Sequence, residues 1–182
     1  MTKKDYISVT ELKKALRDLD EKELTTIIVE AYKKSDDVKQ LLSVKFNREQ
    51  MVQTLFETYK KQIEDEFFPT RGKPKLRLSY AQKAISNFRK MAEDEERTFE
   101  LMMIYVENGV KFTNTFGDIN APFYGSMVTM YSKLMDKCLR YPAFYTKYKK
   151  RLEAIVDDAE GTGWGFPEAL EDELDLILEE ED

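Results

Sequence analysis

The chain has 182 residues and a formal net charge of −6 at pH 7, with 42% hydrophobic and 35% charged residues. That length fits one domain, or one domain and a tail, and the apolar content is sufficient for a folded core. The chain has no histidine, which excludes histidine general bases, Ser-His-Asp and Cys-His catalysis, and histidine-containing metal sites. The single cysteine, Cys138, cannot form an intramolecular disulfide and indicates a reducing, cytoplasmic location.

Helices are predicted along the whole chain, because capping residues are repeatedly followed by apolar residues at steps of three and four. The capping pairs are Ser8 with Glu11, Asp20 with Glu23, Ser79 with Gln82 and, more weakly, Asn47 with Gln50. Three short helices are expected before residue 47, and a long fourth helix ends near Phe67 because Pro69 follows. Five further helices are expected, at about 79–92, 94–115, 122–140, 142–158 and 167–179.

No segment is a convincing strand, since only residues 75–78 alternate and four residues cannot form a sheet alone. The expected fold is therefore all-α, a helical bundle or short α-solenoid of about eight or nine helices with no sheet. We expect a single helical domain over residues 1–160. Residues 161–182 form a glycine- and aromatic-rich loop and an acidic helix, either docked on that domain or tail-like. No signal peptide and no long apolar run is present, so no membrane association is expected.

Charge is concentrated in two segments. Residues 153–182 contain 13 acids and no base, whereas residues 67–92 contain 7 bases and no acid. Because the whole chain carries −6, the remaining residues sum to zero. The acidic end fits a solubilising tail, but Leu170, Leu174, Ile177 and Leu178 at helical spacing also give it an apolar face. Such a helix docks either on its own chain or in the groove of a partner.

The basic segment, residues 67–90, admits three interpretations. It is a loop with an ordinary amphipathic helix, a phosphate or nucleic-acid contact, or a protein-docking site. The candidate binding residues are Arg71, Gly72, Lys73, Lys75, Arg77 and Lys83. Phe67, Phe68 and Pro69 are expected to anchor the segment. Against nucleic acid, the chain as a whole is acidic.

The remaining sequence patterns do not predict a metal, cofactor or catalytic site. The acidic clusters lack the histidines of helical di-metal sites, so no metal site is expected. The glycines of GTGWGF, residues 161–166, do not have dinucleotide-binding spacing, and no strand precedes them. We interpret this loop as a turn that Trp164 and Phe166 anchor on the helical body. No nucleophile, base and oxyanion donors can be assembled, so we expect neither an enzyme nor a cofactor.

Several motifs together resemble one family. These are EFFPTRGKPKLRLSYAQKAISNFRK (residues 66–90), ELKKALRDLDEKELTTIIVEAYKKSDDVKQLL (residues 11–42) and the late GWGF. In them the chain is similar to a family of small bacterial helical proteins of unknown function. The resemblance covers nearly the whole chain, and the first motif is the most specific. It implies a bacterial, cytoplasmic, all-helical protein and draws attention to residues 67–72 and 164–166. It implies no activity, cofactor or catalytic residue.

The sequence predicts a non-enzymatic protein-interaction or adaptor module. It would use the basic segment and the acidic C-terminal helix, with an unidentified protein as partner. The alternative is a nucleic-acid-associated regulator, in which Arg71, Lys73, Lys75 and Arg77 contact phosphate and the acidic helix masks them. A homodimer stays open, because helical proteins with exposed apolar stripes often dimerise.

Overall fold

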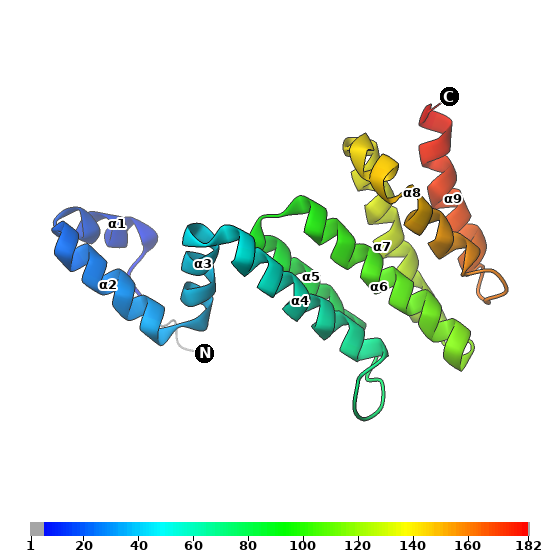
Figure 1. Ribbon diagram of the computed structural model, residues 1–182, viewed down its shortest axis with the longest axis horizontal. Helices are drawn as coiled ribbons and strands as arrows, with labels where there is room; N and C mark the ends of the chain where they lie inside the picture. Colours follow the sequence, from blue (N-terminus) through cyan, green and yellow to red (C-terminus); the bar gives the residue numbers. More distant parts are fainter. Residues whose placement is uncertain (1–5, 182) are drawn as a thin grey trace. The chain divides into compact units, whose positions relative to one another are not determined.

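The computed structural model describes residues 6–181, and the side chains of residues 6–177. This part of the chain forms nine helices and no strand, which confirms the predicted all-α class (Figure 1). The helices are α1 (Val9–Arg17), α2 (Glu21–Lys34), α3 (Asp36–Phe46), α4 (Arg48–Phe67), α5 (Leu78–Ala92), α6 (Glu95–Phe116), α7 (Ala121–Arg140), α8 (Pro142–Asp157) and α9 (Phe166–Glu181). None of them within the described range is long and apolar enough to cross a membrane.

The chain divides into two compact units, residues 1–51 and 52–182, with the boundary in the first turn of α4. We call them the N-terminal and C-terminal units. The division does not coincide with the boundary at residue 160 suggested by the sequence. The acidic α9 falls in the C-terminal unit, where it packs against α7 and α8.

The N-terminal unit follows its capping signals closely. The Ser8 side chain accepts the Glu11 amide while the Glu11 carboxylate accepts the Ser8 amide, and Asp20 with Glu23 repeats this arrangement. These reciprocal bonds satisfy amides that a helix start otherwise leaves unpaired. Helices α2 and α3 pack together. Neither α1 nor α2 buries a residue, however, and α3 buries only Val44.

The C-terminal unit is a helical bundle around α6, which packs against α5, α7 and α8. Each residue of the apolar run Leu101–Val106 is buried. A helix that is apolar on all sides is buried on all sides, so this run places α6 at the centre of the core. Gly109 lets α7 approach closely, because a Cβ there would lie 2.2 Å from the Met127 sulfur. Aromatic rings from α4 to α9 fill the remaining core.

The start of α5 differs from the sequence expectation. Ser79 and Gln82 were expected to form a capping box, but α5 begins at Leu78 and its N-cap residue, Arg77, makes no side-chain cap bond. The Gln82 amide instead donates to the Ser126 hydroxyl of α7 at 2.9 Å. Gln82, which the spacing predicts as a capping residue, therefore links α5 to α7.

Candidate functional site

The loop between α4 and α5, the centre of the basic segment, is held by one buried acid. Glu66 is 3% exposed, and its carboxylate accepts the Arg77 backbone amide at 3.0 Å and the Arg77 guanidinium at 2.5 Å. Its backbone carbonyl accepts the amides of Lys75 and Leu76 at 3.2 and 3.0 Å. The hydrogen bond from Arg77 holds the pKa of the Glu66 carboxyl below its ordinary value. Glu66 thus closes the loop and stays ionised at neutral pH.

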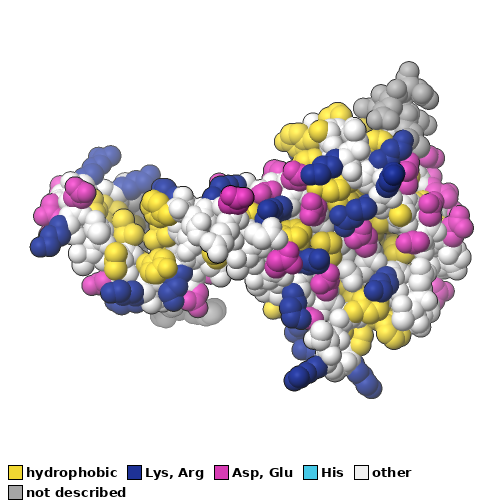
Figure 2. Space-filling model, in the orientation of Figure 1, with side chains coloured by type: hydrophobic (Ala, Val, Ile, Leu, Met, Phe, Trp, Pro, Cys, Tyr) yellow, Lys and Arg dark blue, Asp and Glu magenta, His cyan; other side chains and the backbone are white. Residues whose placement is uncertain are grey.

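The closed loop borders a cleft of about 380 Å³ within the C-terminal unit. Arg71, Gly72, Lys73, Lys75 and Arg77 all line it, so the structure brings together five of the six candidate binding residues. Arg71 and Lys73 are exposed and have no ion-pair partner among the described residues. Figure 2 shows cationic side chains standing out from this part of the surface.

Two of the predicted binding residues have other positions or roles. The Arg77 guanidinium is engaged by Glu66 and lies 4.6 Å from the centre of the Tyr80 ring, so it supports the loop and is not free for phosphate. Lys83 does not line the cleft and lies on the exposed face of α5. The free cations of the loop are therefore Arg71 and Lys73, with Lys75 exposed near the Glu66 carboxylate.

Aromatic residues tie the same loop to the core. Phe67 is fully buried, with its ring 5.7 Å from that of Tyr105. Phe68 is half-buried, and its ring lies 6.2 Å from Phe116 and 4.9 Å from the Lys111 ammonium. Pro69 is also half-buried. The base of the loop is thus fixed by packing, and its tip carries the charge.

The glycine-rich loop before α9 has one aromatic anchor in place of the expected two. Phe166 is 1% exposed, and its ring lies 5.0 Å from that of Tyr124. Trp164 is 63% exposed and has a φ of +65°, so it is not an anchor on the helical body. The loop is also tied by the Gly163 amide, which donates to the Asp118 carboxylate at 3.1 Å.

The acidic helix α9 packs within the C-terminal unit and not as a cover for the basic segment. Leu170, Leu174 and Ile177 are buried, and α9 makes its extensive contacts with α7 and α8. Leu178 lies outside the residues whose side chains are described. The apolar face of α9 is occupied by this packing, and one cation of the basic segment, Arg77, is paired with Glu66 of the same unit.

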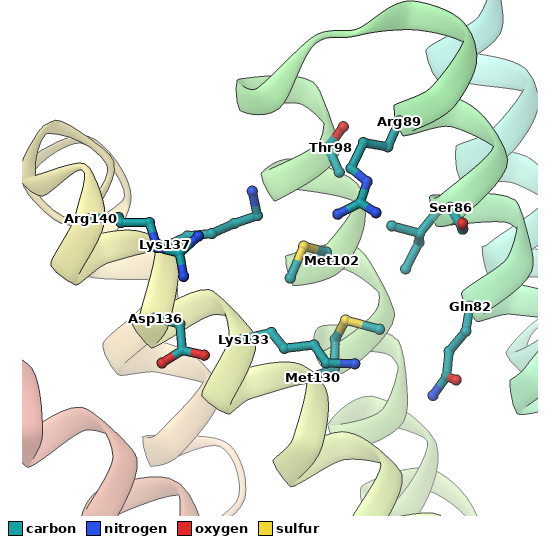
Figure 3. Close-up of a pocket in the computed structure, with 11 residues that line it drawn as sticks. Gln82, Ser86, Arg89, Thr98, Met102, Met130, Lys133, Asp136, Lys137 and Arg140 are labelled. Carbon is teal, nitrogen blue, oxygen red and sulfur yellow. The ribbon is translucent and has the colours of Figure 1, made fainter.

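A second cleft, of about 390 Å³, lies between α5, α6 and α7 (Figure 3). Arg89 enters from α5, while Lys133 and Lys137 enter from α7 and point into the same space. Met102 and Met130, each 5% exposed, form an apolar floor. The other lining residues are Gln82, Ile85, Ser86, Thr98, Asp136 and Arg140. Four cations and one acid give this cleft a net positive lining.

The sequence contains a signal for this second cleft that was not recognised. Met130, Lys133, Lys137 and Arg140 follow one another at steps of three, four and three, so they share one face of α7. That face combines one apolar residue with three cations. Arg89 belongs to the basic segment, but only tertiary packing brings it opposite α7.

A third feature is the uncovered apolar surface of the N-terminal unit, visible in Figure 2. The most exposed examples are Phe46 at 79%, Tyr6 at 75% and Val9 at 69%. Ile27 and Ile28 of α2 are 46% and 51% exposed. Soluble proteins rarely leave so many large apolar side chains in water unless the surface has a partner.

Within the described residues, no group of three or more His, Cys, Asp or Glu side chains could hold a metal ion. The thiol of Cys138 is buried, and burial raises its pKa to about 12, which disfavours the nucleophilic thiolate. The surfaces described above present cations and apolar side chains.

Comparison with known families gives one match. Residues 7–179 match the model of DUF6155, a family of unknown function. The chain belongs to this family. The DUF6155 match spans both units and includes the basic segment, the α5–α6–α7 cleft and all but the last residues of α9. No curated protein and no solved structure matches the chain.

Proposed function

We propose that this protein is a non-enzymatic interaction module that binds a partner protein through two separate contacts, an apolar helical stripe of the partner on the N-terminal unit and an acidic segment of the partner on the basic loop. The observation that carries the proposal is the apolar surface of the N-terminal unit, where α1 and α2 bury no residue. A helical segment with an apolar stripe is the usual complement of such a surface. A cytoplasmic location fits the single free cysteine. A bacterial source is implied by the family resemblance, and both belong to the same proposal.

The charge of the partner is argued from the basic segment. Arg71 and Lys73 stand free at the rim of a preformed cleft, and Glu66 with Arg77 fixes the loop that carries them. Preformed binding groups lose less conformational entropy when a partner binds. The acidic α9 of a second copy is not available as this partner, since its apolar face is already packed. An acidic segment of a different protein is therefore the complement.

The test is an affinity capture from the source cells at low salt, with and without nuclease, using wild type and three double variants. Ile27→Gln with Ile28→Gln removes apolar side chains from the N-terminal unit. Leu139→Gln with Leu176→Gln is the matched control, because these residues are 39% and 52% exposed in the C-terminal unit. A protein that survives nuclease, carries an apolar helical stripe and an acidic segment, and is lost with the first variant but not with the control supports the proposal.

Three other results contradict it. A partner retained by the Ile27 and Ile28 variant does not use the N-terminal apolar surface. A doubled mass in light scattering that this variant abolishes identifies a second copy as the occupant. Partners lost with nuclease, and with an Arg71→Gln, Lys73→Gln variant, favour the nucleic-acid-associated regulator, for which affinity should fall steeply with salt.

A further inference from the structure

Four cations line the α5–α6–α7 cleft, and one of them, Lys137, is paired with a carboxylate. The glutamates of α6 pair with cations of α7 and α8: Glu95 with Lys137, Glu96 with Lys147, and Glu107 with Arg151. Arg89, Lys133 and Arg140 have no such carboxylate partner among the described residues. Three cations without an ion-pair partner among the described residues, and one acid, Asp136, thus line one concave surface of a protein whose net charge is −6.

Gathering like charges without a counter-ion is unfavourable, and a concave site concentrates their field. An anion in the cleft would relieve this repulsion. The placement of the cations on opposite walls, with Arg89 on α5 and Lys133 on α7, allows one anion to be contacted from two sides (Figure 3). An arginine fork and lysine point charges together form a common phosphate-binding set.

The floor of the cleft indicates that the anion also has an apolar part. Met102 and Met130 offer flexible, polarizable side chains that adapt to a flat or aliphatic group. The Ser86 hydroxyl and the Gln82 amide lie on the α5 wall beside them (Figure 3). Gln82 is oriented by Ser126 at 2.9 Å, and Ser126 is itself bonded to the Tyr105 hydroxyl at 2.7 Å. This wall is therefore positioned before any ligand arrives.

We propose that this cleft binds a small organic phosphate of nucleotide size, with its phosphate between Arg89 and Lys133 and its apolar group on the two methionines. A volume of about 390 Å³ lies in the range of small-molecule sites. The inference is independent of the proposed protein partner, because it uses neither the N-terminal unit nor the loop of residues 68–77. It assigns to the protein a ligand site distinct from its interaction surfaces.

The experiment is isothermal titration of the full chain with four probes: ADP, inorganic pyrophosphate, adenosine and citrate. ADP should bind most tightly. Pyrophosphate should bind more weakly, because it lacks the group that covers the methionines, and adenosine should bind weakest. The variant Arg89→Gln, Lys133→Gln should weaken ADP binding at least about tenfold, the loss expected for a charge-assisted hydrogen bond. Both side chains are exposed, so the fold should persist, which circular dichroism checks.

The matched control is Lys149→Gln, Lys150→Gln, which removes the same charge from exposed positions of α8 outside this cleft. It should leave ADP affinity within about twofold, because distant exposed charges are screened. Binding of citrate without ADP or pyrophosphate overturns the phosphate assignment. Absence of binding by all four probes overturns the site. ADP binding that survives Arg89→Gln, Lys133→Gln and is lost in Arg71→Gln, Lys73→Gln places the phosphate on the loop and also overturns it.

Discussion

Helix α2 of the N-terminal unit and α5 of the C-terminal unit have nearly the same length, 14 and 15 residues, and both are amphipathic. They differ in what they bury. α5 buries five residues, including Ile85 and Phe88, whereas α2 buries none. The spacing of apolar residues identifies the apolar face of a helix. It does not show whether another helix packs on that face. The same pattern thus serves as core in one unit and as surface in the other.

The stability of the two units should differ accordingly. Burying one large apolar side chain contributes about 1.5–3 kcal/mol, and the C-terminal unit does this many times. The N-terminal unit, with Val44 as its one buried apolar residue in the described range, depends on its caps and short-range contacts. Small units with little core are only marginally stable.

Amide hydrogen exchange gives the largest expected contrast. Amides in the middle of α2 should exchange at least about a hundredfold faster than those of Leu101–Val106 in α6, because opening α2 exposes little buried surface. Peptide-resolved mass spectrometry of the free chain measures both. Equal protection in the two helices would mean that α2 is covered in solution. Adding the partner should slow amide exchange in α2 and leave amide exchange in α6 unchanged.

Side-chain truncation tests the same contrast energetically. Phe99→Ala in α6 should destabilise the C-terminal unit by about 3–5 kcal/mol, because Phe99 is fully buried between Phe144 and Tyr148. Ile28→Ala should cost less than about 0.5 kcal/mol. Labelling of Cys138 in rising denaturant reports opening of the C-terminal unit, since its thiol is buried. A cost above about 2 kcal/mol for Ile28→Ala would show a covered α2.

Removing the arginine that closes the basic loop should have a smaller but clear effect. Arg77→Ala leaves the buried Glu66 carboxylate without its charged partner and should lower the free energy of unfolding at pH 7. The exposed Arg71→Ala is the control and should cost less than about 0.5 kcal/mol. Chemical denaturation of both variants checks this. If the two lose the same stability, Glu66 does not organise the loop.

The same pair predicts a pH dependence. The hydrogen bond from Arg77 lowers the pKa of folded Glu66 below the ordinary value of 4.5. The unfolded chain therefore takes up the proton first as pH falls. The stabilisation is fully present above about 4.5 and is lost as the pH drops through the folded-state pKa. Arg77→Ala should flatten this part of the stability curve, measured by denaturation at stepwise lower pH.

Alanine substitutions at two glycines of the C-terminal unit should give the smallest difference in stability. Gly125→Ala in α7 should stabilise by about 1 kcal/mol, because a Cβ there meets no atom within 4 Å and alanine favours helix. Gly109→Ala should destabilise by about 1–3 kcal/mol, since its Cβ would overlap the Met127 sulfur. Thermal unfolding measures both shifts. A stabilising Gly109→Ala would mean that Met127 moves aside without cost.

The elements of the fold followed from the sequence because their signals are local. Capping pairs such as Asp20 with Glu23 and breaks such as Pro142 fixed helix ends within a residue or two. Local signals misled where a distant residue competed, as when Gln82 bonded Ser126 and not the start of α5. The expectation for Trp164 fails because composition does not show which aromatic side chain of the loop enters the core, and Phe166 is buried while Trp164 is exposed.

The candidate sites were harder to predict for the same reason. The loop cations Arg71 and Lys73 could be identified because they lie two residues apart in one basic segment of the chain. The role of Arg77 could not, since it depends on Glu66, 11 residues away. The α5–α6–α7 cleft could not be predicted either, because its cations Arg89 of α5 and Lys133 of α7 are 44 residues apart and only the packing of the helices brings them to one cleft. A charge is visible in a sequence, but its counter-charge is visible only in a fold.

The closure of the basic loop by Glu66 and Arg77 has a consequence for how the protein can change. The two residues, with the Glu66 carbonyl, hold the ends of the loop independently of what lies between them. Residues 70–73 can then be exchanged, lengthened or grafted without disturbing the bundle. We expect family members to diversify in this tip while keeping the acid and the arginine together. The loop tip is therefore a position where new sequences can be inserted while Glu66 and Arg77 keep the loop closed.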